Sequence, residues 1–546
     1  MLLRTICALC ATTATLCAQQ LVASGEHANV LAERVVDTDG DGRDELVLVR
    51  AADGAVRAAV VRTAIVGDAI DVRDEHVLDD PAHTLLALAD VHEADGVELV
   101  VSDRSGTSCV VWSGDAPREL IRLVRRARFG LRVDQPLLSP FVSDLNEDGR
   151  PDLLMPGLDG VTPYLCEGHD DGVPTFRRLA RVPVAVTAEV DPGSRGLDQE
   201  LVGRARVPKI RTEDVNGDGR PDLLTVEGTV HEFHLQQPDG TFAAPITVDV
   251  DQFEDSTPKA AIDLGKTAVL GDRKLLQSGD IDGDGIPDYV IAHRRKIWTF
   301  VANGDGPQFR KVRTQAVADD ITHLVVVDID EDGKADLLTF RVRIPSFGSL
   351  LLGLVQSLDI DIKAVGYASE RDGFARAPKW RRTITVRVPP LLSLLSRQEE
   401  FVERFTEIVE KTRISARGHF RTRDTLDLAI ATSDGATLEM LTAVGEAPTF
   451  AREGGRLLRR LIFEDEETVF DVDRIFSILS GFVDTMSART LGERKPDATF
   501  ALRDPQTWRL ADLLPCDVDG QPGDELLVVY HAADDDDRRA YDVWRY

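Results

Sequence analysis

The chain has 546 residues, of which 43% are hydrophobic, so it is long enough for several domains or for one repeat architecture with a sizeable core. Its 64 basic and 94 acidic residues give a net charge of −30, which argues against a nucleic-acid-binding surface because such surfaces are basic. Beyond the N-terminus, no apolar run approaches the roughly 20 residues of a membrane-spanning helix, so no membrane span is predicted.

The N-terminal sequence MLLRTICALCATTATLCAQQ is typical of a secretory signal peptide. It combines one positive charge, an apolar stretch and a small-residue end, which predicts cleavage near Ala18. We therefore expect residues 1–18 to be a signal peptide and the mature chain to be secreted, periplasmic or held at the cell surface; the alternative is an N-terminal hydrophobic helix. The remaining cysteines have no paired spacing, so we expect buried free thiols, with one bridge as the alternative, at Cys109, Cys166 and Cys516.

An acidic phrase recurs along the chain with the pattern DxDxDGxxDL. The five good copies are DTDGDGRDEL from Asp37, DLNEDGRPDL from Asp144, DVNGDGRPDL from Asp214, DIDGDGIPDY from Asp280 and DIDEDGKADL from Asp328. Three weaker copies begin at Asp90, near His419 and at Asp517. A short apolar segment precedes most copies, and a β-rich run, a second apolar run and a Gly-Asp turn follow. Each unit is therefore predicted to be strand, acidic loop, strand, strand, turn, strand.

The spacing of these loops predicts the architecture. Most loops start roughly 50 to 70 residues apart, and a four-stranded propeller blade needs roughly 40–50. Eight loops predict an all-β propeller of eight four-stranded antiparallel blades, or seven if one weak copy is spurious, because radial closure protects the sheet edges. The segment near residues 20–23 would supply a strand that the last blade lacks. Runs with helical spacing predict two helical insertions near 391–415 and 455–495; two or three β-sandwiches are the alternative fold.

The loop DVNGDGRPD (214–222) carries the oxygen ligands that a calcium ion needs. Alternation turns the side chains at positions 1, 3 and 5 toward one centre, Gly219 at position 6 permits a sharp turn, and an acid at position 9 closes the shell. The candidate ligands are the side chains of Asp214, Asn216, Asp218 and Asp222 and the carbonyl of Arg220. Oxygen-only ligands favour calcium over zinc or copper. The alternative is a turn rich in Asp, Asn and Gly that binds no ion.

The repeated phrase between β-strands, with a later GDGxF-type turn, resembles the FG-GAP/VCBS repeats of integrin-α-like β-propellers. The resemblance covers nearly the whole mature chain, so residues 19–546 are expected to form a single propeller. It implies the same calcium ligands in the other good loops: Asp37, Asp39, Asp41, Glu45 and the Arg43 carbonyl; Asp144, Asn146, Asp148, Asp152 and the Arg150 carbonyl; Asp280, Asp282, Asp284, Asp288 and the Ile286 carbonyl; and Asp328, Asp330, Asp332, Asp336 and the Lys334 carbonyl. A sixth site is a weaker candidate because Gln and Pro replace the Asp-Gly, at Asp517, Asp519 and Glu525.

The sequence contains none of the motifs GxSxG, HExxH, GxGxxG or GxxxxGK[ST], and no catalytic residue is predicted. The two histidines of HEFH (231–234) are expected to point to opposite faces of a strand. We expect a monomeric, non-enzymatic, calcium-stabilised scaffold that binds an extracellular glycan or protein. The alternatives are a polysaccharide lyase or hydrolase built on a propeller and a structural component of the cell surface, and the fold does not decide among them.

Overall fold

The chain is all-β, as predicted. The computed structural model describes residues 20–52, 57–112, 119–133, 135–184, 187–190, 203–206, 209–256, 273–343, 356–390, 414–432, 434–444, 459, 469–471, 474, 478 and 495–546. Two short 3-10 turns, η1 (Pro81–His83) and η2 (Val250–Gln252), accompany the strands. The predicted signal peptide and nearly all of the two predicted helical insertions lie outside the described residues.

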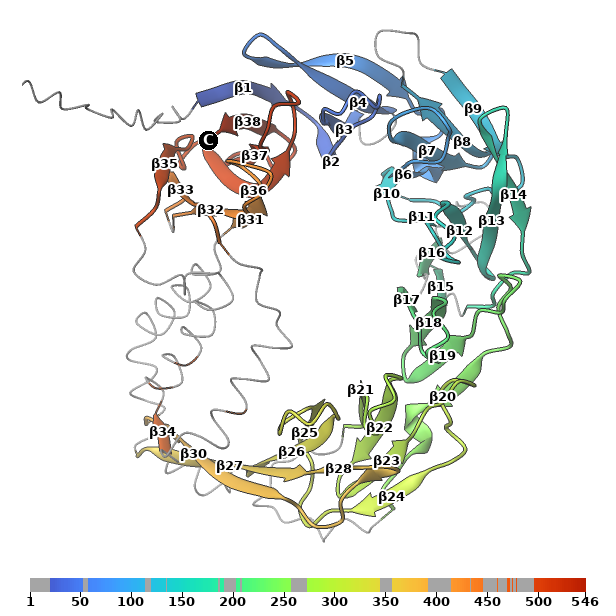
Figure 1. Cartoon of the computed structure of the whole chain (residues 1–546), viewed down its shortest axis with the longest axis vertical. Coiled ribbons are helices and arrows are strands. Elements are labelled where there is room, and N and C mark those ends of the chain that lie inside the picture. The colour runs from blue at the N-terminus through green and yellow to red at the C-terminus, as the bar shows by residue number, and fades with distance from the viewer. Residues whose placement is uncertain are drawn as a thin grey trace, which may run out of the picture.

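The strands of the N-terminal half pair in successive antiparallel sheets (Figure 1). The first sheet contains β2 (Val30–Val36), β3 (Glu45–Ala52), β4 (Arg57–Val66) and β5 (Ala69–Val77). The second contains β6 (Leu85–Ala89), β7 (Glu98–Asp103), β8 (Gly106–Val111) and β9 (Glu119–Val124), with the parallel edge strand β10 (Leu137–Leu138). The third contains β11 (Val142–Ser143), β12 (Asp152–Gly157), β13 (Gly160–Asp170) and β14 (Val173–Arg178). A separate pair contains β15 (Thr187–Val190) and β16 (Gly203–Arg206).

Two four-stranded sheets follow in the middle of the chain. The first contains β17 (Lys209–Glu213), β18 (Asp222–Glu227), β19 (Val230–His234) and β20 (Ile246–Asp249). The second contains β21 (Leu275–Gly279), β22 (Asp288–His293), β23 (Lys296–Phe300) and β24 (Arg313–Ala316). Both have the strand order of the chain, so each is a meander of consecutive hairpins, as the repeat predicts.

The C-terminal sheets keep this plan with additions. One contains β25 (His323–Val327), β26 (Asp336–Arg343), β27 (Leu358–Tyr367), β30 (Trp380–Val388) and β34 (Val469–Asp471), beside the hairpin of β28 (Ser369–Glu370) and β29 (Gly373–Phe374). The next contains β31 (Ser415–Gly418), β32 (Asp427–Ala431), β33 (Thr437–Leu441) and β35 (Ala498–Ala501). The strand β34 lies within a run that the sequence predicts to be mostly helical, and it pairs in parallel with β30, Thr385 opposite Val469.

The last sheet joins the two ends of the chain. It contains β36 (Trp508–Cys516), β37 (Glu525–Ala532), β38 (Arg539–Arg545) and β1 (Gln20–His27). The strand β1 is antiparallel to β38, from Gln20 opposite Arg545 to His27 opposite Arg539, which confirms that an N-terminal segment completes the last sheet. A parallel bridge from Ser24 to Ala69 of β5 links this sheet to the first one. In Figure 1 the described sheets follow one another around an open ring, with the C-terminus beside β1.

The hydrophobic core lies between neighbouring sheets. One cluster joins Leu224 and Phe233 of one sheet to Tyr289, Trp298 and Phe300 of the next, with Phe233 and Tyr289 edge to face at 5.2 Å. Each such aromatic side chain contributes about 1.5–3 kcal/mol when it is fully buried. Alternate residues of a strand therefore pack toward opposite neighbours, and this packing fixes the loops that join the strands.

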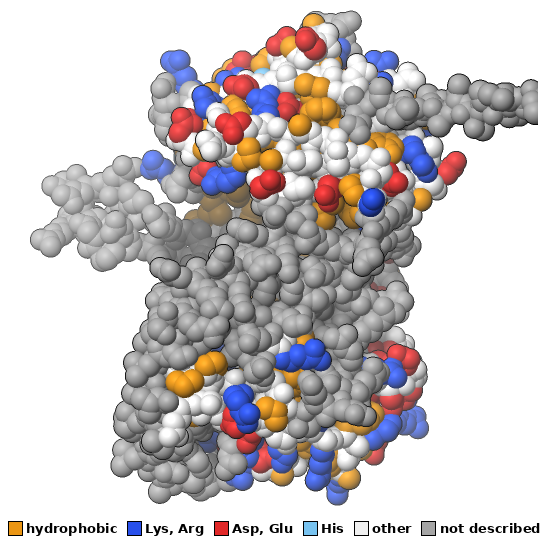
Figure 2. Space-filling model, turned by 90° about the vertical axis from the view of Figure 1, so that its left-hand side faces the viewer, with side chains coloured by type: hydrophobic (Ala, Val, Ile, Leu, Met, Phe, Trp, Pro, Cys, Tyr) orange, Lys and Arg blue, Asp and Glu red, His pale blue; other side chains and the backbone are white. Residues whose placement is uncertain are grey.

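The surface shows no segregation of charge on the face drawn in Figure 2. Acidic and basic side chains of the described residues are interspersed there, both above and below the central region. Among the residues that Figure 2 colours, basic side chains do not form one continuous area.

Candidate metal-binding loops

The five good acidic loops occupy equivalent places in the fold. Each connects the first strand of its sheet to the second: β2–β3, β11–β12, β17–β18, β21–β22 and β25–β26. In each loop the glycine at position 6 has a positive φ, for example +81° at Gly219 and +86° at Gly285. The prediction that this position needs the freedom of glycine is confirmed.

The acid at position 1 holds the turn together. Asp280 accepts hydrogen bonds from the backbone N–H of Gly283 (2.7 Å, Oδ1) and Gly285 (2.9 Å, Oδ2). Asp37 does the same with Gly40 (2.7 Å) and Gly42 (2.9 Å). These bonds draw the loop around its first carboxylate, so that the side chains at positions 3 and 5 lie close to it.

The acid at position 9 ties the loop to the sheet behind it. Asp288 is 1% exposed; its Oδ2 accepts from the N–H of Ile281 (2.9 Å) and its Oδ1 from the N–H of Ala302 just beyond β23 (2.7 Å). Asp222 repeats both bonds, to Val215 (3.1 Å) and Gln236 (2.7 Å). The pattern also recurs at Asp152 and Asp336. These residues were predicted only as ligands, and their structural role follows from hydrogen bonds to a backbone segment 14 to 33 residues further along the chain.

Burial raises the pKa of these closing acids, because a charged carboxylate is poorly solvated there. Desolvation raises the pKa of Asp152, Asp222 and Asp288 to about 6, against the backbone hydrogen bonds that lower it. Desolvation also raises the pKa of Asp336 and Glu45. Nearby carboxylates at the other loop positions raise the pKa of the closing acid further, as Asp282 and Asp284 do for Asp288. A divalent cation in the loop would relieve this repulsion.

Several loops gather carboxylates closely enough to hold a cation. One ligand atom from each acid lies within 4.8 Å of the others in four described groups: Asp37, Asp39 and Asp41; Asp280, Asp282 and Asp288; Asp328, Asp330 and Asp332; and Asp517, Asp519 and Glu525. In the two remaining good loops an asparagine stands at position 3, and Asn216 Nδ2 donates to Asp218 Oδ2 (2.9 Å). All the candidate ligand atoms in these loops are carboxylate, amide or backbone carbonyl oxygens in tight turns, so the residues present fit calcium.

The first loop already contains positive charge. Arg62 of β4 donates to Asp39 Oδ2 at 3.1 Å, and both side chains are only 2% exposed. Arg73 reaches the same oxygen at 3.2 Å. The other oxygen, Asp39 Oδ1, is buried without a hydrogen-bond partner, so it is free to coordinate a cation in addition to the two arginines.

The loops differ in how far basic side chains compensate their acids. Lys379 pairs with Asp330 in the 328 loop, and Arg545 pairs with Asp519 and Glu525 in the 517 loop. In the 280 loop, none of the described ion pairs involves its acids. Its Asp282 has a raised pKa, caused first by burial and then by Asp284. Judged by the ion pairs of the described residues, the 280 loop is therefore the strongest candidate for a metal ion.

The weaker copies at Asp90 and near His419 keep the closing acid at position 9 although they lose the acids at positions 3 and 5. Glu98 is 1% exposed and its Oε2 accepts from the N–H of Val91 (2.8 Å) and His92 (3.1 Å). Asp427, fully buried, accepts from the N–H of Arg421 (2.9 Å) and Ala443 (2.8 Å). Asp427 was not among the predicted site residues; the signal that identifies it is the Asp-Leu pair at the start of β32.

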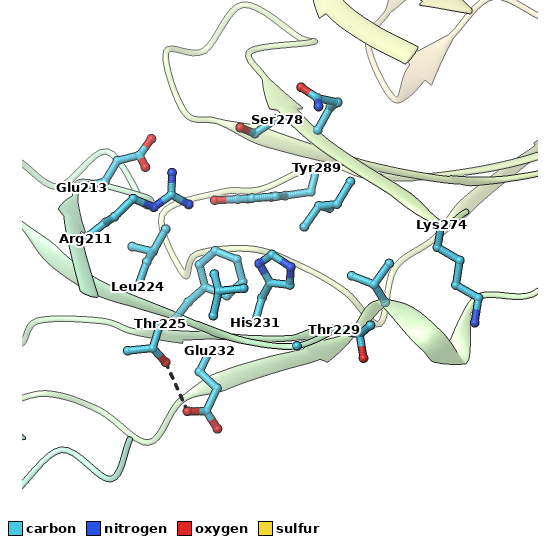
Figure 3. Close-up of a pocket in the computed structure, with 16 residues that line it drawn as sticks. Arg211, Glu213, Leu224, Thr225, Thr229, His231, Glu232, Lys274, Ser278 and Tyr289 are labelled. Carbon is cyan, nitrogen blue, oxygen red and sulfur yellow. Dashed lines mark hydrogen bonds between the residues drawn. The ribbon is translucent and has the colours of Figure 1, made fainter. Parts of the chain in front are cut away.

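A cavity of about 490 Å³ lies between the β17–β20 sheet and the β21–β24 sheet. Figure 3 shows Tyr289 on one side, facing Leu224 and His231, with Arg211 and Glu213 at one end. Burial, and then the charge of Arg211, lower the pKa of His231, so its imidazole is neutral at neutral pH. His234 lies on the opposite face of β19, fully buried, with its pKa lowered to about 4 by desolvation. The opposed orientation of the two histidines is as predicted.

The three remaining cysteines are free and buried. Burial raises the pKa of Cys109 to about 12 and also raises that of Cys166. These thiols are therefore poor nucleophiles, and the expectation of buried free thiols is confirmed. No helix in the described residues is both long and apolar enough to span a membrane.

Comparison with known proteins identifies the repeat. Residues 280–339 match the model of the FG-GAP-like repeat, which confirms the resemblance seen in the sequence. No curated protein matches the chain. Solved structures with some similarity include an Agrocybe aegerita lectin that recognises non-reducing terminal N-acetylglucosamine (15% identity, 66% of this chain and 80% of that chain, TM-score 0.27) and Sqt1 from Chaetomium thermophilum (9%, 96% and 99%, TM-score 0.32). A protein from Lactobacillus plantarum has 10% identity over 75% of this chain and 91% of its own, with a TM-score of 0.21. At these TM-scores the similarities carry no functional argument.

Proposed function

We propose that this chain with an FG-GAP-like repeat is an exported, calcium-stabilised β-propeller of eight blades, which binds an extracellular glycan or protein without catalysing a reaction. The observation that supports this most is the repetition of one loop design. The same carboxylates recur at the same strand connection in successive sheets, and four groups bring ligand atoms within 4.8 Å. Extracellular calcium modules typically bind their ion at about 10⁻⁴–10⁻³ M.

The acids of a loop have two different roles: some hold the loop in place, and others would bind the ion. The acids at positions 1 and 9 accept backbone N–H groups and set the loop against its sheet, as Asp280 and Asp288 do. In the 280 loop, the acids at positions 3 and 5 have no basic partner among the described residues, and a bound ion would supply the positive charge that offsets their repulsion. A rigid frame of this kind presents other loops for binding, where recognition residues usually lie.

The calcium part of the proposal is tested by thermal unfolding of residues 19–546. A ligand that binds only the folded state stabilises it by RT ln(1 + [L]/Kd), about 1.4–2.7 kcal/mol per site at 10 mM calcium for a Kd of 10⁻³–10⁻⁴ M. We expect the unfolding temperature in 10 mM calcium to exceed that in chelator, and to exceed that in 10 mM magnesium. An equal temperature in calcium and chelator would refute calcium stabilisation.

The binding part is tested on an array of polysaccharides and matrix proteins, probed in millimolar calcium and again in chelator. Calcium-dependent retention on one class of ligand would support a binding scaffold. Release of fragments from a spot would overturn the non-enzymatic assignment and favour a lyase or hydrolase. If no ligand on the array retains the protein and none releases fragments, the proposed partners are contradicted and a structural role is favoured.

A further inference from the structure

A second cavity, of about 310 Å³, has an unusual lining for so acidic a chain. It lies where the end of the β6–β9 sheet meets the β11–β14 sheet, and Figure 1 shows β9 beside β13 and β14. Its polar lining consists of Arg126, Arg128, Arg178, Thr162 and Tyr164, and it contains no carboxylate. We propose that this cavity binds an oxyanion, a sulfate or phosphate group, either free or as an ester on a small body such as a sugar.

The first two arginines lie on a segment that the fold holds firmly. Between and after them, Ala127 and Phe129 are buried in the core, at 0% and 3% exposure, so Arg126 and Arg128 are left on the outer side. The carbonyl of Ala127 accepts the hydroxyl of Thr107 at 2.8 Å, and the N–H of Phe129 donates to the carbonyl of Asp103 at 2.9 Å. The backbone that carries the two guanidinium groups is thus anchored on both sides.

The third arginine comes from the neighbouring sheet. Arg178 is the last residue of β14 and stands directly opposite Tyr164 of β13 in the strand register. Tyr164 is 3% exposed and belongs to the same core cluster as Ala127 and Phe129. One shared core therefore fixes both walls of the cavity, and the site is assembled before any ligand arrives.

None of these three arginines has a carboxylate partner within the described part of the chain. Arg128 Nε donates only to the carbonyl of Arg125 (3.1 Å), which leaves its terminal nitrogens for a ligand. Two other arginines of the neighbouring sheet do have acidic partners: Arg177 pairs with Glu167 at 2.7 Å, and Arg181 pairs with Asp159. Three guanidinium groups without a carboxylate partner make this cavity locally positive in a chain whose acids outnumber its bases by 94 to 64, which favours an anionic ligand.

The geometry of arginine indicates the class of anion. The planar guanidinium group binds phosphate-like and carboxylate oxygens in bidentate fashion, and three such groups suit a tetrahedral oxyanion with several acceptors. The volume exceeds that of a bare ion, and Thr162 supplies a hydroxyl for a further contact. The chain as a whole carries a net charge of −30, which disfavours a polyanionic chain, so we assign a single anionic group and not a polymer.

The test is titration calorimetry of residues 19–546 with glucose 6-sulfate, glucose 6-phosphate, sodium sulfate and glucose, in calcium held constant. We expect both esters to bind and glucose not to bind. If the esters bind more tightly than sodium sulfate, the ligand is an ester; equal affinities indicate that the free anion is the ligand, and either result supports the oxyanion site. Absence of binding by any anion at 10 mM, or equal binding of glucose, would overturn it.

Variants locate the site. Arg126→Gln and Arg178→Gln should each weaken ester binding at least tenfold, since a charge-assisted hydrogen bond is lost. Arg181→Gln is the matched control, an exposed arginine of the same region that is paired with Asp159 and does not line the cavity. Unchanged binding in both cavity variants would refute the site even if the anions bind elsewhere. This result is independent of the ligand array, because it needs neither a polysaccharide nor a matrix protein.

Discussion

Replacement of Glu98 by glutamine should make the protein more stable at neutral pH and alter how its stability depends on pH. Glu98 is 1% exposed, and desolvation raises the pKa of its carboxyl group from 4.5 to about 7, despite hydrogen bonds from the N–H of Val91 and His92. Both N–H groups reach the same oxygen, Oε2, so the single carbonyl oxygen of glutamine can accept both of them. The substitution therefore removes a buried charge while it keeps the loop closed.

The sign follows from proton binding. Between pH 4.5 and 7 the folded carboxyl holds its proton while the unfolded one has lost it, so stability falls as the pH rises through this range and is constant above it. A shift of 2.5 pH units corresponds to about 3 kcal/mol at pH 7.5, at 1.36 kcal/mol per unit. Glu98→Gln should thus be more stable than the wild type by up to about 3 kcal/mol at pH 7.5 and equal to it at pH 4.5.

Urea denaturation at pH 4.5, 6 and 7.5 measures this difference in the free energy of unfolding. Glu93→Gln is the matched control, because Glu93 is an exposed acid of the same loop, with a side chain 60% exposed. Other buried acids, such as Asp288, contribute to the slope in both proteins and cancel in the comparison. Parallel pH profiles for Glu98→Gln and the wild type, or a less stable variant at pH 7.5, would refute the reasoning.

Three further outcomes are expected. Asp282→Asn should reduce the calcium-induced rise in unfolding temperature more than Asp39→Asn, because Arg62 already pairs with Asp39; equal losses would contradict the charge argument. Asp427→Ala should lower the free energy of unfolding by about 1–3 kcal/mol, since it removes the buried carboxylate that accepts from the N–H groups of Arg421 and Ala443. The exposed Asp424→Ala should change it by less than about 0.5 kcal/mol in the same urea assay. The three thiols should not react with a chromogenic disulfide reagent in the native protein and should all react in guanidinium; rapid native reaction would show that they are accessible.

Local patterns in the sequence predict the repeating unit well. The glycine at position 6 and the acid followed by an apolar residue at position 9 determine where the loop turns and where the second strand begins, and both effects act over a few residues. The strand positions of all five good loops follow from them, as at Asp222 and Asp288.

Local sequence patterns do not predict contacts between distant segments of the chain. Arg62 lies on β4, after the loop that contains its partner Asp39. The spacing of the two residues in the sequence does not predict that they pair. The oxyanion cavity likewise combines Arg126 with Arg178 from a different sheet. The strand β34 arises where the local pattern favours a helix, because pairing with β30 outweighs intrinsic preference.

The pairing of β1 with β38 has a consequence for biosynthesis. A ribosome delivers β1 more than 500 residues before its partner strand, so the last sheet must close an exceptionally long stretch of chain. Until then β1 presents an unpaired edge, which in a nascent chain is a template for intermolecular pairing. The edge of β1 is therefore covered only after β38 has been synthesised.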